Sequence, residues 1–252
     1  MDYTARDAVE AGFAGAVLVV REDVREELCD HVEKYWPSEL EVEVVVQGPI
    51  AGTAQAVASA APVVDESFGV VNADDLYGTD AMLRLARDVT ELSGDRHAIV
   101  GYQLSRTVLN DAPVTRGVCE TTSDGDLVRI VEQTVSRRPG GFAGTPIGAP
   151  ESMPATALSG EEIVSMNLWG FSRSIFAELE GALDRFDPET APHPPNKPAE
   201  LLLPAVVASL VENAKASVRV SETDARCIGI THPDDLPLVR QLVAGERHRS
   251  GT

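Results

Sequence analysis

The chain has 252 residues, with 21 lysines and arginines against 40 aspartates and glutamates, which gives a formal net charge of −19 at pH 7. A surface this acidic repels polyanions, so neither nucleic acid nor an anionic membrane is expected as a partner. The three cysteines and five histidines are dispersed without a CxxC or HxxxH pair, which argues against a zinc site and a disulfide framework. There is no apolar run of about 18 residues and no secretory signal, so we expect a cytoplasmic protein.

Helix-like and strand-like segments alternate along the chain, which is typical of a layered α/β fold. Residues 16–20 (AVLVV) form a continuous apolar run, as expected for a parallel strand covered on both faces. The expected helices are 3–12, 24–35, 53–61, 79–92, 174–185, 201–213 and 233–244. The expected strands are 16–20, 40–46, 68–72, 98–104, 117–121, 127–133, 163–170, 217–220 and 226–230.

Turn and loop signals separate these segments. Asp124-Gly125 is a hairpin turn signal between the strands 117–121 and 127–133. Residues 137–160 are rich in Gly, Pro, Ala and Ser, and residues 186–199 are rich in proline, so both are expected to be flexible loops. With no internal repeat, residues 1–252 are expected to form a single domain.

An acidic motif follows the expected strand 68–72, where Asn72 and Ala73 lead into Asp74 and Asp75. Open α/β sheets bind ligands at the carboxyl ends of their strands. Carboxylates at that place suit a Mg²⁺ ion that bridges phosphates. The same acids also fit a turn and a helix N-cap, where Asp is favoured. The pattern alone leaves both interpretations open.

A glycine-bearing turn runs from Gln47 through Gly52 to Thr53 and leads into a helix of small residues. Small residues allow a flat ring or a phosphate to approach the backbone closely. A loop that merely turns a corner has the same composition, so this interpretation also stays open. Both motifs follow the carboxyl ends of expected strands, and a single cleft would bring them together.

The order of these two motifs resembles the sugar-phosphate nucleotidyltransferases, the family of nucleotide-sugar pyrophosphorylases. Residues 7–13 (DAVEAGF) are similar to the first helix of that family, residues 130–132 (IVE) to its sugar-site strand, and residues 165–171 (SMNLWGF) to a later strand with an asparagine. The resemblance extends from Asp2 to about Leu236. It implies a Rossmann-like, mixed but mostly parallel sheet with helices on both faces, of the nucleotide-diphospho-sugar transferase type.

The resemblance also implies a role for individual residues. The nucleobase would be held by Gln47, Gly52 and Thr53. Asp74, the expected catalytic residue, would ligate Mg²⁺, and Asp75 beside it would be the second metal-binding aspartate. The acceptor pocket would be lined by Gly117, Glu132 and Asn167, with Glu200 as a weaker candidate.

The implied partners are a nucleoside triphosphate and a sugar 1-phosphate or a similar small phosphorylated metabolite. In the implied reaction a phosphate oxygen attacks the α-phosphorus of the nucleotide in line and pyrophosphate leaves. No covalent protein nucleophile is needed, because positioning and charge neutralisation supply the rate.

The sequence departs from the family pattern at several places. Gln133 stands where a lysine usually follows the acceptor-site glutamate, and Thr231 falls where a second metal aspartate is expected, with Asp234 and Asp235 nearby. The family's first strand and its Gly-rich loop with Arg and Lys, which cradle the triphosphate, would precede Met1. Without that strand, residues 16–20 would lack one neighbour. We therefore expect either a translation start upstream of Met1 or remaining strands that close the gap in a chain without turnover.

Two alternatives remain beside the nucleotidyltransferase interpretation. One is a catalytically inactive relative that binds a nucleotide or a sugar ligand. The other is a glycosyltransferase, since such enzymes also combine a nucleotide-binding α/β sheet with an acidic metal motif.

Overall fold

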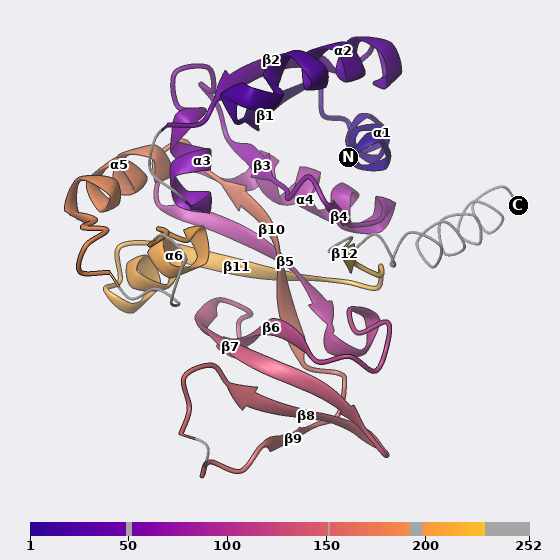
Figure 1. The fold of residues 1–252 in the computed structure, drawn as a ribbon, viewed down its shortest axis with the longest axis vertical. Helices are drawn as coiled ribbons and strands as arrows, with labels where there is room; N and C mark the ends of the chain where they lie inside the picture. Colours follow the sequence, from indigo (N-terminus) through magenta and orange to yellow (C-terminus); the bar gives the residue numbers. More distant parts are fainter. Residues whose placement is uncertain (49–51, 151, 192–198, 230–252) are drawn as a thin grey trace, which may run out of the picture.

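The computed structural model describes residues 1–48, 52–150, 152–191 and 199–229 (Figure 1). The described α-helices are α1 (Asp2–Ala11), α2 (Arg25–Tyr35), α3 (Thr53–Ser59), α4 (Thr79–Glu91), α5 (Ile175–Arg185) and α6 (Leu203–Glu212), with short 3-10 turns η1 (Glu22–Val24) and η2 (Leu104–Arg106). The described strands are β1 (Gly15–Val20), β2 (Glu41–Val46), β3 (Phe68–Val70), β4 (Asp75–Leu76), β5 (Arg96–Gln103), β6 (Val114–Thr121), β7 (Leu127–Arg138), β8 (Gly141–Pro146), β9 (Thr156–Leu158), β10 (Ile163–Phe171), β11 (Ser217–Thr223) and β12 (Ile228–Gly229). None of the helices in these ranges is long and apolar enough to cross a membrane.

Local sequence signals set several helix boundaries. Gly12 ends α1 in the left-handed conformation, with φ of 95°, and its N–H bonds back to the carbonyls of Ala8 and Val9. Pro204 lies in the first turn of α6, where the missing N–H costs nothing. The expected helices that fall in the described ranges are therefore present, with ends shifted by a few residues.

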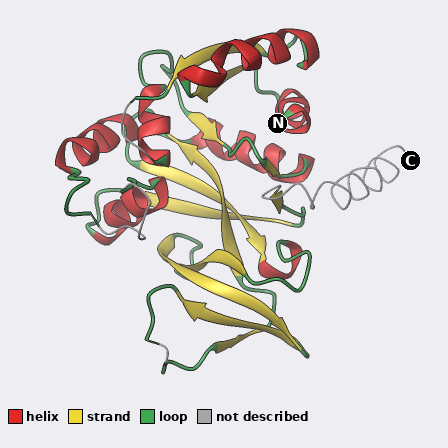
Figure 2. Cartoon of the chain, viewed as in Figure 1, coloured by secondary structure: helices red, strands yellow, loops and turns green. Residues whose placement is uncertain are grey.

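The central sheet is mixed. Its strand order is β11-β5-β10-β6-β7-β8-β9, and β3 also pairs with β10. Strand β11 is parallel to β5, whereas β10 is antiparallel to β3, β5 and β6. Strands β3, β5 and β11 thus run in one direction and β10 runs against them. Helices lie on both faces, so the predicted mixed α/β fold class is confirmed (Figure 2).

Two hydrophobic clusters cover the two faces of this sheet. Helix α4 packs against one face through Leu85, in the cluster that also contains Val100 of β5. Helices α3, α5 and α6 cover the other face and lie together in Figure 1. Ile99, the neighbour of Val100, belongs to that second cluster, because successive strand residues point to opposite faces. Strand β5 is therefore buried on both sides.

Strands β6 to β9 extend the sheet as an antiparallel ribbon. The hairpin of β6 and β7 is confirmed, and Gly125 in its turn has a φ of 84°. The expectation of a loop over 137–160 is wrong, because β7 continues to Arg138 and both β8 and β9 lie in that range. Its glycines serve close strand packing, since a Cβ at Gly144 would collide with the side chains of Gln133 and Leu158.

Some sequence expectations fall outside the described residues. Residues 192–198 of the expected loop 186–199 are among them. The end of the last expected strand, the expected helix 233–244 and residues Thr231, Asp234 and Asp235 also lie outside.

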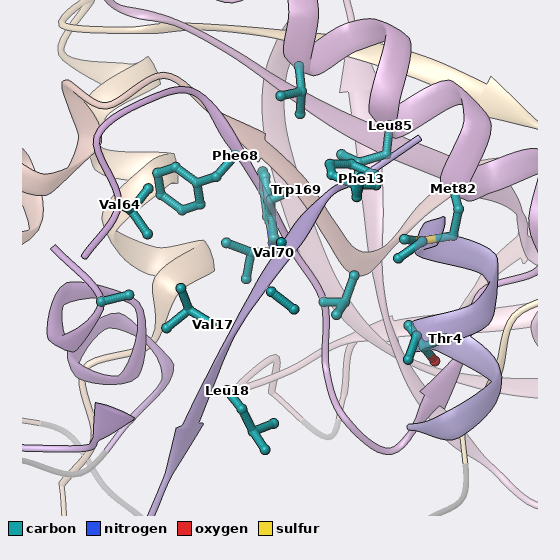
Figure 3. Close-up of a pocket in the computed structure, with 18 of the residues that line it drawn as sticks. Thr4, Phe13, Val17, Leu18, Val64, Phe68, Val70, Met82, Leu85 and Trp169 are labelled. Atoms are coloured by element: carbon teal, nitrogen blue, oxygen red, sulfur yellow. The ribbon is translucent and has the colours of Figure 1, made fainter. Parts of the chain in front are cut away.

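Strands β1 and β2 form a separate parallel pair, with register from Gly15–Glu41 to Val20–Val46. In the described part of the chain β1 pairs with β2 alone and β3 pairs with β10 alone. Between β1 and β3 lies a cavity of about 1580 Å³, which both strands line. We call it the β1–β3 cavity (Figure 3). Of the two alternatives that the sequence left open, the one in which the remaining strands close the gap beside β1 is therefore wrong for the described residues.

Candidate functional site

The β1–β3 cavity has an apolar body, with polar residues both before and after β3. It is lined by Val17 and Leu18 of β1, by Phe68 and Val70 of β3 and by Trp169 of β10, which lies beside Phe68 (Figure 3). The polar lining includes residues that follow or flank the carboxyl end of β3, together with the start of α3: Thr53, Asn72, Asp74 and Asn167. Three residues predicted for different roles, Thr53, Asp74 and Asn167, thus line one cavity.

The acidic motif forms a tight turn between β3 and β4. Asp74 is exposed and lines the cavity, whereas Asp75 is 8% exposed. The Asp75 carboxylate accepts hydrogen bonds from Asn72 Nδ2 at 2.9 Å and from the Tyr77 hydroxyl at 3.4 Å. Burial raises the pKa of Asp75 and the nearby Asp74 adds to the rise, while the two hydrogen bonds and Arg116 oppose it.

The predicted nucleobase turn is closed by its own hydrogen bonds and by the segment before α6. Gln47 Nε2 donates to the carbonyl of Gly52 at 3.2 Å. The N–H of Leu203 donates to Thr53 Oγ1 at 2.9 Å, and the N–H of Ala54 donates to the Leu201 carbonyl at 3.0 Å. Residues 49–51 of this turn lie outside the described residues.

Gly52 makes a close approach that only glycine permits. Its φ is 116°, and a Cβ there would collide with the backbone of Leu201. Glu200, predicted for the acceptor wall, is exposed and directly precedes Leu201. The chain therefore places Glu200 beside the nucleobase turn.

The predicted acceptor residues Gly117 and Glu132 are direct partners on β6 and β7, and Gly117 also pairs with Ser165 on β10. A Cβ at Gly117 would lie 3.0 Å from Glu132 Oε1 and 2.6 Å from Ile130 Cγ2, so the glycine leaves room for the glutamate. The Glu132 side chain reaches solvent, but partial desolvation raises its pKa, and Arg116 opposes the rise.

Asn167 lies where β10 changes partners. Residues 164–165 of β10 pair with β6, residues 169–171 pair with β3, and the register against β5 shifts in between. Asn167 has a φ of 58°, a conformation that asparagine tolerates better than most residues. Its N–H donates to Ser165 Oγ at 3.2 Å, and its Oδ1 accepts from Trp169 Nε1 at 3.4 Å. Asn167 therefore lies between the part of β10 that pairs with β6, which carries Gly117, and the β1–β3 cavity, which Asn167 lines.

The residues present fit a magnesium ion by their chemistry. Mg²⁺ is commonly held by one or two carboxylates together with substrate phosphates and water. Asp74 offers one such carboxylate at the cavity, which Asn72 also lines. Within the described ranges no group of three or more His, Cys, Asp or Glu side chains forms a ready-made metal cage.

The sequence prediction missed Arg116. This arginine lies directly opposite Gln133 in the β6–β7 register, beside the position where the resemblance implies a lysine. Its Nε and Nη2 donate to Oγ1 and to the carbonyl of Thr107 at 3.0 and 2.7 Å. Burial lowers its pKa, while Asp75 and Glu132 are among the acidic groups that oppose the shift. The β6–β7 connection spans residues 122–126, and the Gly125 N–H closes its turn by donating to the Thr122 carbonyl at 3.1 Å. The Asp124-Gly125 signal therefore predicted the hairpin, but not the register shift at Glu120 and Thr121 or a role for Arg116.

The comparisons with known proteins agree with this geometry. The sequence matches the nucleotidyl transferase family over residues 1–190, whereas no curated protein matches it. The solved inositol-1-phosphate CTP transferase from T. maritima is 16% identical with a TM-score of 0.62, covering 92% of this chain and 76% of that chain.

Two further solved structures share the fold. HddC from Yersinia pseudotuberculosis is 16% identical with a TM-score of 0.53, covering 93% of this chain and 81% of that chain. A UDP-glucose pyrophosphorylase complexed with UDP-glucose is 15% identical with a TM-score of 0.55, covering 90% of this chain and 79% of that chain. At these identities the structures establish the fold, while the family match spans most of the sequence. The chain therefore belongs to the nucleotidyl transferase family.

Proposed function

We propose that the protein joins a nucleoside monophosphate, taken from a nucleoside triphosphate, to a sugar 1-phosphate or a similar small phosphate. A bond forms between an acceptor phosphate oxygen and the α-phosphorus, the bond from the α-phosphorus to the bridging oxygen breaks, and pyrophosphate leaves. One observation carries the proposal. Thr53, Asp74 and Asn167, which come from three different elements, line the same cavity.

In this proposal the residues divide into a nucleotide side and an acceptor side. Gln47 and the Gly52–Thr53 backbone hold the nucleobase, and Glu200 stands beside that turn. Gly117, Glu132 and Asn167 hold the acceptor, with Asn167 at the junction of the two sides. The chain contributes mainly by placing both substrates for in-line attack, which phosphoryl-type transfers require above all.

Asp74 is proposed to hold Mg²⁺. When bound, the ion neutralises phosphate charge. Without it, the net negative charge of the chain would repel the phosphates. Asp74 suits this role because its side chain is exposed at the cavity. Asp75 is the nearest further carboxylate in sequence, and it is buried.

The proposal also needs cations for the triphosphate. Among the described residues that line the β1–β3 cavity, Arg87 is the one lysine or arginine. We propose that the first strand implied by the resemblance lies in this cavity between β1 and β3, and that the Gly-rich loop with Arg and Lys that follows this strand supplies the cations. A strand at that place would satisfy the facing edges of both neighbours.

Pyrophosphate release tests the function. The four common nucleoside triphosphates are offered with Mg²⁺ and a panel of sugar phosphates, both to this chain and to a longer form translated from the in-frame codons upstream of Met1. Asp74→Asn should lower turnover at least about a hundredfold, because it removes the carboxylate that is proposed to hold Mg²⁺ at the reacting phosphates. Asp184→Asn is the matched control, since Asp184 is exposed on α5, away from the cavity.

Three results would contradict the proposal. Ligand binding without turnover by the longer form would favour an inactive binding relative. Transfer or hydrolysis starting from a ready-made nucleotide-sugar, without pyrophosphate, would favour a glycosyltransferase. Equal turnover by the Asp74→Asn and Asp184→Asn variants would remove Asp74 from the reaction.

A further inference from the structure

Two adjacent carboxylates of the acidic motif face different surroundings. Asp74 is exposed at the β1–β3 cavity, while Asp75 is 8% exposed and does not line it. Asp75 begins β4, which pairs with β12 through Gly229. Asp74 belongs to the turn before this strand, whereas Asp75 and the next two residues, Leu76 and Tyr77, are all buried. The buried segment therefore begins at Asp75, directly after the exposed Asp74.

The buried Asp75 carboxylate is hydrogen-bonded to Asn72 and Tyr77, which lie on either side of Asp74 in the sequence. We call the hydrogen bonds among Asn72, Asp75 and Tyr77 the ring. Asn72, on the amino side of Asp74, donates from Nδ2 to Asp75 Oδ2 at 2.9 Å. The main-chain carbonyl of Asp75 accepts a hydrogen bond from Thr4 Oγ1 at 3.2 Å, which fastens the same residue to α1. Ala73 and Asp74 are therefore held at the tip of a turn whose two ends are joined by side chains.

Tyr77 contacts both other members of this ring. Its hydroxyl accepts a hydrogen bond from the Asn72 N–H at 2.9 Å and lies 3.1 Å from the carbonyl of Met166 and 3.4 Å from Asp75 Oδ2. The side chain is 1% exposed, so it cannot touch a substrate. The carbonyl of Tyr77 in turn accepts from the Tyr102 hydroxyl at 3.0 Å, which ties the ring to β5.

We infer that Asp75 is a positioning residue that, together with Tyr77, fixes the turn presenting Asp74, and that Asp75 is not itself a metal ligand. The inference rests on the proposed function of Asp74 as the carboxylate that holds a divalent cation. It replaces the expectation that both aspartates bind the metal. Residues that orient a metal ligand commonly alter metal affinity about 10- to 100-fold when they are changed.

The experiment measures Mn²⁺ affinity, with the free ion followed by electron paramagnetic resonance. Asp75→Asn removes the charge but keeps a side-chain oxygen that can accept from Asn72 and Tyr77. We expect its Mn²⁺ affinity to stay within about twofold of the wild type, whereas Asp75→Ala and Tyr77→Phe should each weaken it about tenfold or more. Asp74→Asn should abolish measurable binding, and Asp184→Asn should leave it unchanged.

A second measurement separates positioning from general stability. Thermal melting by circular dichroism reports folding, and amide hydrogen exchange at Asn72 reports the ring directly. Asp75→Ala and Tyr77→Phe should speed exchange at Asn72, while Asp75→Asn should not. A role in stability alone would lower the melting temperature of these variants and leave the Mn²⁺ affinity of the folded fraction unchanged.

The outcomes distinguish this inference from the proposed function. If Asp75→Asn loses Mn²⁺ binding as fully as Asp74→Asn, then Asp75 is a ligand and the inference is overturned while the function stands. If Tyr77→Phe and Asp75→Ala keep wild-type affinity, the ring does not position Asp74 and the inference also fails. Absence of Mn²⁺ binding by the wild-type protein, with and without nucleoside triphosphate, overturns both.

Discussion

Strands β1 and β5 have similar apolar sequences but very different surroundings. Strand β5 pairs with β10 on one edge and β11 on the other, and residues 97–102 are all buried. Strand β1 pairs with β2 alone among the described strands, and Val20 is its one buried residue. The apolar run of residues 16–20 predicts a strand that is covered on both faces. The run does form strand β1, but most of its residues are only partly buried. Composition predicts that a segment is extended, whereas burial depends on which strands lie beside it.

The N-terminal layer, which consists of α1, β1, α2 and β2, is attached to the rest of the fold mainly through α1. Asp2 Oδ1 accepts hydrogen bonds from His31 and Trp36, which links α1 to α2 and the residues that follow it. At the other side of α1, Thr79 Oγ1 donates to Asp7 Oδ1 at 3.0 Å at the start of α4. These links are polar and partly exposed, so they contribute less stability than the apolar packing of the central sheet.

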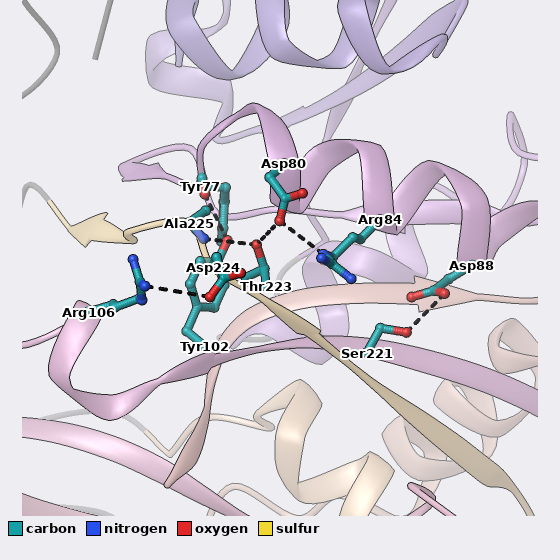
Figure 4. A network of polar contacts seen from close by, with 10 residues as sticks. All are labelled: Tyr77, Asp80, Arg84, Asp88, Tyr102, Arg106, Ser221, Thr223, Asp224 and Ala225. Carbon is teal, nitrogen blue, oxygen red and sulfur yellow. Dashed lines mark hydrogen bonds and ion pairs between the residues drawn. The ribbon is translucent and has the colours of Figure 1, made fainter. Parts of the chain in front are cut away.

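Strand β11, at one edge of the central sheet, is held more firmly than β1. Helix α4 presents Asp80 and Asp88 to β11, where they accept hydrogen bonds from Thr223 at 2.6 Å and Ser221 at 3.0 Å (Figure 4). Because β11 also pairs along its length with β5, it is fixed by both its backbone and its side chains. Both β11 and β1 lie near the margins of the fold, so they differ in the elements that bind them. Strand β11 is bound by β5 and α4, whereas β1 pairs with β2 alone among the described strands.

The largest expected difference is in amide hydrogen exchange. Residues 98–102 of β5 should exchange only when the whole domain unfolds, whereas residues 16–19 of β1 should exchange by local opening. We expect the protection factors to differ by on the order of a thousandfold. Exchange followed by mass spectrometry measures this directly. Equal protection in the two strands would mean that β1 is as firmly integrated as β5.

Removing a core side chain from β5 should come next in size. Ile99 is 0% exposed and belongs to the cluster that joins the sheet to α3, α5 and α6. Ile99→Ala should lower the free energy of unfolding by about 2–5 kcal/mol, through lost transfer energy and a residual cavity. Urea denaturation gives the value. A loss below about 1 kcal/mol would place Ile99 outside the cooperative core.

The sequence predicted these elements well but predicted less of their environment. Apolar runs and helical spacing located β5 and α4 because each carries its period in its own residues. The failure at 137–160 has a local reason, since Gly141 and Gly144 were interpreted as loop residues and instead allow β8 to approach its neighbours closely. A single sequence does not separate these two uses of glycine.

The candidate site was predictable to a similar degree. Asp74 and Thr53 belong to motifs that each follow the end of a predicted strand, and the resemblance to the family assigns their roles; both line one cavity. The different orientation of Asp75 was not predictable, because it depends on Tyr77 and on the pairing of β4 with β12. Contacts between elements distant in the chain leave no local pattern.

Acidification should weaken the central sheet through His97. Burial lowers the pKa of this histidine to about 4, and the nearby Asp95 opposes the shift. Its Nδ1 accepts a hydrogen bond from the Ser172 N–H at 3.3 Å, so the ring is neutral in the folded state. Unfolding then takes up a proton between pH 6.5 and about 4, and the stability that is complete above pH 6.5 is lost as the pH falls through this range.

The loss from His97 should reach up to about 3 kcal/mol near pH 4, on the scale of 1.36 kcal/mol per pKa unit. Urea denaturation between pH 4 and 8 measures it, with His97→Asn as the control. Asparagine keeps an acceptor near the position of Nδ1 but does not titrate, so its pH dependence should be smaller. If the two proteins lose stability in parallel, other groups cause the acid sensitivity.

The smallest expected effect is that of Leu18→Ala in β1. Leu18 lines the β1–β3 cavity and is only half-buried, so truncation removes little apolar contact that the fold already makes. We expect a loss below about 1 kcal/mol in urea denaturation, against about 2–5 kcal/mol for Ile99→Ala. The same substitution in a longer form whose added segment fills the cavity should cost more, because Leu18 would then be enclosed on both sides. An unchanged small cost in a longer form that is otherwise more stable would show that the added segment packs elsewhere. The ratio of the Leu18 and Ile99 costs therefore measures how completely β1 has joined the central sheet.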